Sequence, residues 1–170
     1  SELDARLDPY FSQNYYNEAF STLFRGKYPV HSIKELSTLI TSGITPKSGG
    51  EAYTEDKENG VPFIRSGNID INGDIDFEDL LYIKPDIHET IMKSSQVKKN
   101  DLMIAIVGAT IGQVGIYLDN REANINQAIA LVRLKKGNDV QYIKEIIRSE
   151  VGQLSLNRLK RPVARANINL

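Results

Sequence analysis

The stretch LMIAIVGATIGQVGI, residues 102–116, constrains the fold more than any other part of the sequence. Its first six residues are all apolar, so a strand formed there has no polar face and is expected to be buried on both sides. Gly108, Gly112 and Gly115 follow, and the residues around the last of them suit a second strand. We therefore expect a central buried strand that leaves the core through a glycine-rich turn.

The spacing of these glycines argues against a nucleotide-binding loop. A phosphate-binding loop requires a lysine directly after its last glycine, and Gln113 follows Gly112 here. A dinucleotide-binding fingerprint has glycines two and then three residues apart at the start of a helix, whereas these spacings are four and three before a strand-like segment. We expect the three glycines to allow the turn and the close approach of another backbone.

Two helices are predicted in the first quarter of the chain. One covers residues 8–26, because Asp8 can cap it and Pro9 suits its first position. The other begins at Ser32, where Glu35 completes the spacing of a capping box. This second helix is expected to carry the apolar residues Leu36, Leu39 and Ile40.

Two more helices are predicted further along. Asp86 is expected to cap a short helix that runs through Lys93. A longer amphipathic helix is predicted over residues 138–154, after Gly137. Its apolar stripe consists of Ile143, Ile146, Ile147, Val151 and Leu154.

Strands are predicted mainly in the middle of the chain. Besides the central strand, residues 61–69 are strand-like, with Pro62 at the start or on an edge. Residues 113–118 and 126–134 are expected to form a hairpin around a turn at 119–122. The pattern predicts an α+β fold, a single domain over residues 1–170 with a mixed, mainly antiparallel sheet flanked by helices.

Composition narrows the class of protein. The chain has 170 residues, 41% of them hydrophobic, and no cysteine, so disulfides, thiolate metal sites and cysteine catalysis are excluded. The two histidines, His31 and His88, are far apart in the sequence, so we expect no metal site. No apolar run approaches ~18 residues and no signal peptide is visible, so we expect a cytoplasmic protein without a membrane partner.

Charge is unevenly distributed although the net charge is −1. Residues 70–79 hold five acids and no base, and residues 155–170 hold four bases and no acid. Such asymmetry fits one face that meets a polyanion and another that avoids it, but two solvated loops would look the same. The segment DINGDIDFEDL also resembles a calcium loop, yet its glycine is at position 4 instead of 6 and Leu81 stands where the bidentate acid belongs.

No motif predicts a catalytic residue. The nucleophile-elbow pattern is absent, and the pair Ser95 and Lys98 matches a serine–lysine spacing that arises easily by chance. Glu55 and Lys57 have a spacing seen in nuclease sites, but no apolar strand holds them. We therefore expect no catalytic, cofactor-binding or metal-binding residues in this chain.

Polar side chains suited to DNA recur at predicted strand ends and loops. Arginine pairs with guanine, asparagine and glutamine pair with adenine, and lysine and arginine neutralise phosphates. The alternative is that the amides satisfy turn backbones and the arginines are solvated. The candidates are Lys47, Ser48, Tyr53, Arg65, Ser66, Asn68, Thr110, Gln113, Asn124, Asn126, Gln127, Arg158, Lys160, Arg161 and Arg165.

The order of several short segments resembles a known family. The chain reads SGITPKSG, VPFIRSGNI, VKKNDLMIAIVGATIGQVGI, ANINQAIALVRL, YIKEIIRSEVGQ and ARANINL, after the opening LDARLDPYFSQNYY. This series is similar to the target recognition domain of type I restriction–modification specificity subunits, and the resemblance covers residues 3–170. Residues 1–26 correspond to the lead-in helix of such domains.

The resemblance implies a role in sequence-specific recognition of double-stranded DNA. Specificity subunits usually carry two recognition domains separated by long coiled-coil helices, here absent or outside the chain, and each domain reads half of a bipartite site. The implied partners are methyltransferase and restriction subunits and a second recognition domain, in the same chain or as a homodimer. S-adenosylmethionine, ATP and Mg²⁺ are expected on partner subunits alone. Specificity is expected in residues 47–60, after Arg65 and in 156–166, while the glycine turn is expected to be scaffold.

Two alternatives remain open at this point. Similar recognition domains end fused chains that carry methyltransferase and nuclease modules, so the whole protein could be an enzyme. The second alternative is a binding module for protein or carbohydrate, for which the aromatic residues of the first predicted helix would serve as an interface.

Overall fold

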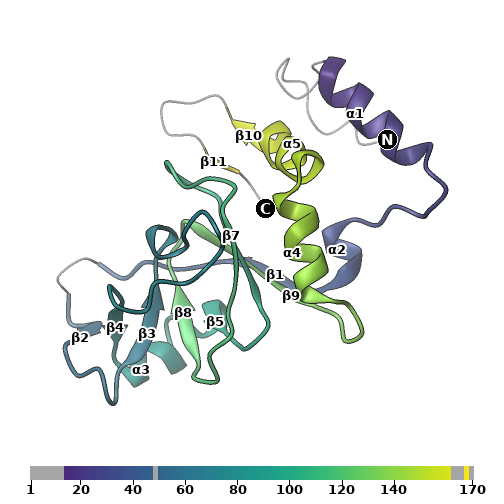
Figure 1. The fold of residues 1–170 in the computed structure, drawn as a ribbon. Helices are drawn as coiled ribbons and strands as arrows, with labels where there is room; N and C mark the ends of the chain where they lie inside the picture. Colours follow the sequence, from purple (N-terminus) through teal and green to yellow (C-terminus); the bar gives the residue numbers. More distant parts are fainter. Residues whose placement is uncertain (1–13, 48–49, 162–166, 169–170) are drawn as a thin grey trace.

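A computed structural model describes residues 14–47, 50–161 and 167–168 (Figure 1). The predicted α+β fold is confirmed, and its strands divide between two main sheets and one short ladder. The ladder pairs β10 (Lys160–Arg161) with β11 (Asn167–Ile168) in antiparallel orientation.

The four-stranded sheet has the order β1-β9-β6-β7 and is antiparallel throughout. Its strands are β1 (Ser37–Ser42), β9 (Ile129–Leu134), β6 (Leu102–Ala105) and β7 (Val114–Ile116). Leu102 and Ile104 of β6 pack into a cluster with the buried face of a helix, and Met103 packs into a cluster shared with the other sheet. The predicted burial of this strand on both faces is confirmed.

The five-stranded sheet has the order β2-β4-β3-β8-β5. β3 and β8 are parallel, and the other neighbours are antiparallel. The parallel pair aligns Ile64 with Ile125, so the segments that follow the two strands leave the sheet at the same edge. The strands are β2 (Tyr53–Thr54), β4 (Leu81–Ile83), β3 (Val61–Ile64), β8 (Ala123–Ile125) and β5 (Gln96–Val97).

The predicted hairpin between residues 113–118 and 126–134 is wrong. β7 pairs with β6, and β9 lies between β1 and β6, so the two segments are not neighbours. Between them the chain crosses to the five-stranded sheet, where Ala123 and Ile125 of β8 are fully buried. Burial of these two residues in the core favours an extra strand over a tight turn.

The two short helices are shorter than predicted. The capping box of Ser32 and Glu35 is present, but α2 (Ile33–Leu36) has a single turn and Leu39 and Ile40 belong to β1. The β-branched sequence of this segment pairs with β9 instead of extending the helix.

The helix predicted over residues 86–93 starts and ends earlier. α3 (Pro85–Glu89) begins at Pro85, which suits a first helical position, and Lys84 is its N-cap residue in place of Asp86. Two short 3₁₀ turns, η2 (Ser66–Asn68) and η3 (Lys93–Ser95), complete this part of the chain.

The helix predicted over residues 138–154 is broken into α4 (Val140–Arg148) and α5 (Glu150–Leu159). Ser149 lies between them with an extended backbone, and its side chain accepts a hydrogen bond from the N–H of Gly152. The predicted stripe is only partly buried: Ile143 and Ile147 enter the core, whereas Ile146 is 46% exposed.

The first helix, α1 (Asn14–Phe24), lies against α5 (Figure 1). The guanidinium of Arg158 stands over the ring of Phe20, 5.1 Å from its centroid. Tyr16 is buried, and the neighbouring Tyr15 is half exposed. The predicted start at residue 8 lies outside the described residues. Within the described ranges, no helix has the length and apolar content needed to cross a bilayer.

Replacing Tyr117 with phenylalanine is expected to stabilise the protein by up to ~1 kcal/mol. Tyr117 is fully buried, and its hydroxyl has no hydrogen-bond partner among the described residues, so its desolvation is uncompensated. Burial raises the pKa of Tyr117 from 10.0 to about 12, and the negative charge of Asp119 is the second-largest cause. The folded state therefore loses stability relative to the unfolded state as pH rises from about 10 to about 12.

Urea unfolding at neutral and alkaline pH measures both effects. The phenylalanine variant should match or exceed the parent at neutral pH and should lose less stability at alkaline pH. Tyr142→Phe is the matched control, because Tyr142 is 63% exposed and should change neither quantity. A clear loss of stability in Tyr117→Phe at neutral pH would contradict the prediction.

Candidate nucleic-acid interface

The parallel pair β3–β8 gathers several predicted DNA-binding residues at one edge. The N–H of Asn126 donates to the carbonyl of Ile64 at 3.0 Å, which fixes the end of β8 beside the end of β3. The N–H of Gln127 donates to Thr45 Oγ1 at 3.2 Å, which adds the loop after β1. The predicted DNA-binding residues at the ends of β3 and β8 and in the loop after β1 are here named the polar edge: Lys47, Arg65, Ser66, Asn126 and Gln127.

The glycine turn borders the polar edge. The N–H of Ile106 donates to the carbonyl of Ala128 at 2.8 Å, so β6 enters the turn next to Gln127. Gly108 and Gly112 have φ values of +90° and +93°, which confirms that the turn requires glycine there. Gln153 of α5 donates to the carbonyl of Gly112 at 2.9 Å and holds the turn against that helix.

Two predicted DNA-binding residues lie on this turn. Thr110 and Gln113 are both partly exposed, and the N–H of Gln113 donates to the carbonyl of Thr110 at 3.0 Å. The Oε1 atom of Gln113 is buried and has no hydrogen-bond partner among the described residues. The exposed parts of Thr110 and Gln113 are therefore the polar surface of this turn, while Gln113 Oε1 is closed to solvent.

Arg65 is held in place by Asp79. Its Nη2 donates to the carbonyl of Asp79 at 2.8 Å and to the carboxylate at 2.9 Å. The Arg65 side chain is 36% exposed, although its Nε is buried and has no hydrogen-bond partner among the described residues. Asp79 belongs to the acidic stretch of residues 70–79. This stretch therefore contacts a basic residue of the polar edge, Arg65.

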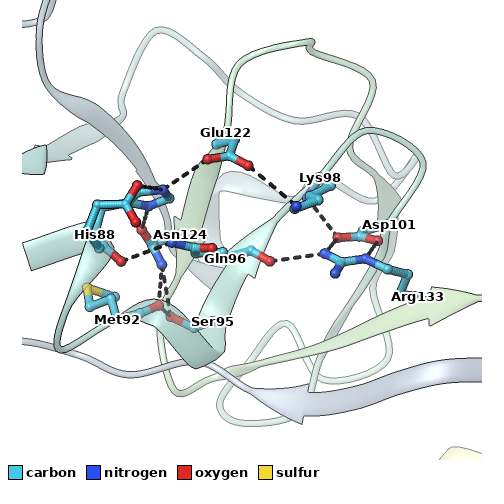
Figure 2. Close-up of polar contacts among 10 residues, drawn as sticks. His88, Met92, Ser95, Gln96, Lys98, Asp101, Glu122, Asn124 and Arg133 are labelled. Atoms are coloured by element: carbon cyan, nitrogen blue, oxygen red, sulfur yellow. Dashed lines mark hydrogen bonds and ion pairs between the residues drawn. The ribbon is translucent and has the colours of Figure 1, made fainter.

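Three predicted DNA-binding residues make internal contacts. Asn124 is fully buried and donates to the carbonyl of Met92 and to Ser95 Oγ, at 2.9 and 3.0 Å (Figure 2). Asn68 is buried and accepts a hydrogen bond from the N–H of Arg65. Tyr53 packs edge-on against Phe63 and donates to the carbonyl of Pro46. Asn124 and Asn68 are therefore closed to a ligand, whereas Tyr53 is only partly buried and stays a predicted contact.

The basic C-terminal segment is anchored near the glycine turn. The N–H of Ile168 in β11 donates to the carbonyl of Ile106 at 2.9 Å, and β10 carries Lys160 beside β11. Arg158 is engaged with Phe20. Ser48 and Arg165 lie outside the described residues, and of Arg161 only the backbone is described.

The segment that resembles a calcium loop is an acidic turn. The carboxylate of Asp70 accepts hydrogen bonds from the N–H groups of Asp74 and Asn72, both at 2.8 Å. These bonds lower the pKa of the Asp70 carboxyl, and the bond from the N–H of Asp74 has the largest effect. Arg148 of α4 donates to the carbonyl of Ile71 at 3.3 Å and fastens the turn to that helix.

The loop predicted to carry specificity borders an open cleft of about 750 Å³. Glu55 and Lys57, whose spacing resembles a nuclease pair, lie on its wall, and Leu80 and Tyr82 supply apolar surface. Glu55 and Lys57 are both exposed to solvent in this loop. A region that contacts a large ligand requires such exposure.

Replacing Gly43 with alanine is expected to cost about 2 kcal/mol of unfolding free energy. A Cβ at this position would overlap the carbonyl oxygens of Ile125 and Asn126, so the loop after β1 would have to move away from the polar edge. Gly67→Ala is the matched control, because no atom lies within 4 Å of its Cβ position. Thermal and urea unfolding measure both variants, and equal stability of the two would contradict the prediction.

Comparison with known proteins identifies the family. No family model matches the chain. Over 117 residues, 68% of the chain, it is 33% identical to the specificity subunit of the type I restriction enzyme EcoBI from Escherichia coli, and the match covers 24% of that protein. The chain thus spans about a quarter of the length of this relative.

Solved structures share the fold. The S subunit of a type I restriction–modification system from M. genitalium superposes with a TM-score of 0.51 at 13% identity, over 82% of this chain and 30% of that chain. A chain from a structural study of complex assembly and conformational transition of the type I R-M system gives 0.50 at 15% identity, over 83% and 35% of the respective chains. With the sequence relation to the EcoBI subunit, the chain belongs to the type I restriction–modification specificity subunits, as a target recognition domain.

Proposed function

We propose that this domain reads one half of a bipartite double-stranded DNA site and is itself non-catalytic. The observation that carries the proposal is the sequence relation to the EcoBI specificity subunit over 68% of the chain. The polar edge supports it, because strands far apart in the sequence bring side chains that can bind bases and phosphates to one place.

The residues of the polar edge divide by chemistry. Gln127 has an exposed side chain whose amide can pair with an adenine edge in the major groove. Lys47 is exposed and can neutralise a phosphate. Arg65 can take either role, and Thr110 of the bordering turn can donate to the DNA backbone.

The proposed domain depends on partner subunits. A net charge of −1 implies few neutralised phosphates, so binding by the isolated domain should be weak and salt-sensitive. A second recognition domain, in the same chain or as a homodimer, would supply the other half of the site and raise the affinity through linkage. Methyltransferase subunits with S-adenosylmethionine and restriction subunits with ATP and Mg²⁺ would supply the chemistry.

Selection from randomised duplexes, with the methyltransferase subunits present, tests the proposal. The expected result is enrichment of one short half-site. Failure to enrich any sequence at low salt would overturn DNA reading and favour a protein- or carbohydrate-binding module. Incubating the chain alone with labelled S-adenosylmethionine and the selected duplex should give no methyl transfer, and robust transfer would overturn its non-catalytic role.

Replacing Lys47 with alanine is expected to reduce the slope of log affinity against log salt by ~0.9, the value for one lost phosphate contact. Sequence preference should not change, because a phosphate contact carries no base information. Lys99→Ala is the control, since Lys99 is exposed near Asn120 at the opposite end of β8. Anisotropy titrations over a range of salt concentrations measure the slopes, and equal slopes for the parent and Lys47→Ala would remove Lys47 from the interface.

A further inference from the structure

A cluster of His88, Glu89 and Glu122 lies at the end of β8 opposite the polar edge. His88 belongs to α3 and is buried, whereas Glu122 directly precedes β8 and reaches it from the other side. His88 Nε2 is 3.2 Å from Glu122 Oε2 and 3.7 Å from Glu89 Oε1. One ligand atom from each residue lies within 4.8 Å of the others.

The hydrogen bonds of Asn124 determine which nitrogen of His88 carries a proton. The Nδ2 group of Asn124 donates to the carbonyl of Met92, which can only accept, so the amide orientation is fixed. Asn124 Oδ1 therefore faces His88 Nδ1, and Nδ1 must donate to it. In a neutral ring Nε2 then carries a lone pair, and this lone pair points toward the carboxylate of Glu122 (Figure 2).

A lone pair that faces two carboxylates is an arrangement that a cation stabilises. With metal–ligand lengths of about 2.0–2.2 Å, neighbouring ligands of a tetrahedral zinc ion lie about 3.3–3.6 Å apart. The distances of 3.2 and 3.7 Å from Nε2 to the two glutamates are close to this separation. Histidine that binds a metal usually donates its other N–H to an oxygen, as His88 does to Asn124.

The surroundings also suit a divalent cation. The side chain of Gln96 donates to the backbone carbonyl of His88 at 3.2 Å and so holds the backbone of His88 in place. Lys98 lies 3.7 Å from Glu122 Oε1 and leaves Oε2 for a metal. Two carboxylates outnumber the single lysine around the ring, and the exposed glutamates leave an entry path from solvent.

We propose that His88 Nε2, Glu89 and Glu122 bind a divalent transition-metal ion of the zinc class, with water completing the coordination. The mixed nitrogen and oxygen ligands favour this class over Mg²⁺, which prefers oxygen alone. The ion would join α3 to the connection between β7 and β8 and so stabilise the five-stranded sheet. The site is independent of the DNA-reading proposal, because its residues lie at the other end of β8.

Calorimetric titration of the 170-residue chain with Zn²⁺ in a non-chelating buffer tests the proposal. The expected result is saturable binding of one ion per chain, a higher melting temperature with Zn²⁺, and little response to Mg²⁺. Glu89→Gln and Glu122→Gln keep the shape of the side chains and should each weaken binding by about tenfold or more. Glu145→Gln on α4 is the control and should bind like the parent.

Nitrogen NMR of the histidine rings separates metal binding from protonation. The chain has two histidines, so the signals of His88 and His31 can be told apart with a single His31→Gln variant. Zn²⁺ should shift Nε2 of His88 and leave His31 unchanged. The proposal is overturned if no saturable binding occurs, if the two glutamine variants bind like the parent, or if Nε2 responds to pH but not to Zn²⁺.

Discussion

Replacing Arg133 with methionine is expected to lower the free energy of unfolding by about 3 kcal/mol. Asp101 is buried, and Arg133 donates from Nε to Oδ1 at 2.8 Å and from Nη2 to Oδ2 at 2.6 Å (Figure 2). Asp101 in turn raises the pKa of Arg133. Methionine keeps the apolar stem but leaves the buried carboxylate with the backbone N–H of Lys98 as its remaining described partner. Urea unfolding measures the change.

A matched ion pair shows whether burial causes this effect. Arg121 also donates from two nitrogens to one aspartate, Asp119, but its side chain is 55% exposed. Arg121→Met should therefore cost less than ~1 kcal/mol. Adding Asp101→Asn to Arg133→Met removes the unpaired charge and should restore part of the stability. Equal losses for the two methionine variants, or no recovery in the double variant, would contradict the explanation.

Replacing Arg65 with alanine is expected to weaken duplex binding by about tenfold, or ~1.4 kcal/mol. Its guanidinium lies at the polar edge and is already ordered by Asp79, so binding loses less side-chain entropy. Asp79→Asn removes a charge that repels phosphate and keeps the bond from Arg65 to the backbone carbonyl of residue 79, so it should strengthen binding. Fluorescence anisotropy with the selected duplex and the methyltransferase subunits measures both variants.

Arg121→Ala is the matched control for position. Arg121 has the same kind of aspartate partner but precedes β8, at the opposite end from the polar edge. Little change in binding is expected there, while the melting temperatures of both variants show whether each remains folded. If Arg121→Ala weakens binding as much as Arg65→Ala, general attraction explains the effect and the polar edge is not the interface.

Local sequence patterns predicted the elements of the fold better than their partners. The apolar run of β6, the capping box at Ser32 and the glycine turn could be read from neighbouring residues. The crossing of residues 119–125 to the second sheet could not, because it depends on burial of Ala123 and Ile125 among residues distant in the sequence. The sequence does not predict the break at Ser149, because the apolar periodicity continues through it.

The polar residues of the site were harder to assign from sequence. Asn124 and Gln127 have similar amides and lie three residues apart, yet one is buried and the other is exposed. Their difference follows from position and not from residue type, because Asn124 lies inside β8 whereas Gln127 lies in the turn after it. The separation of the two histidines in the sequence predicts no metal site, whereas the neighbours of His88 in space are glutamates from α3 and from the residue before β8. Glu122 is far from Glu89 in the sequence, so no local spacing marks the cluster.

β1 is an edge strand whose partner in the sheet is β9, so it stays unpaired on the ribosome until β9 has been synthesised. Thr38 bonds to the carbonyl of Arg133, 95 residues later, so β1 leaves the ribosome long before its partner. At ordinary translation rates this delay is about 5–20 s. During that time the uncharged segment STLITS is an unpaired strand former, and aggregation in this interval would depend on translation speed.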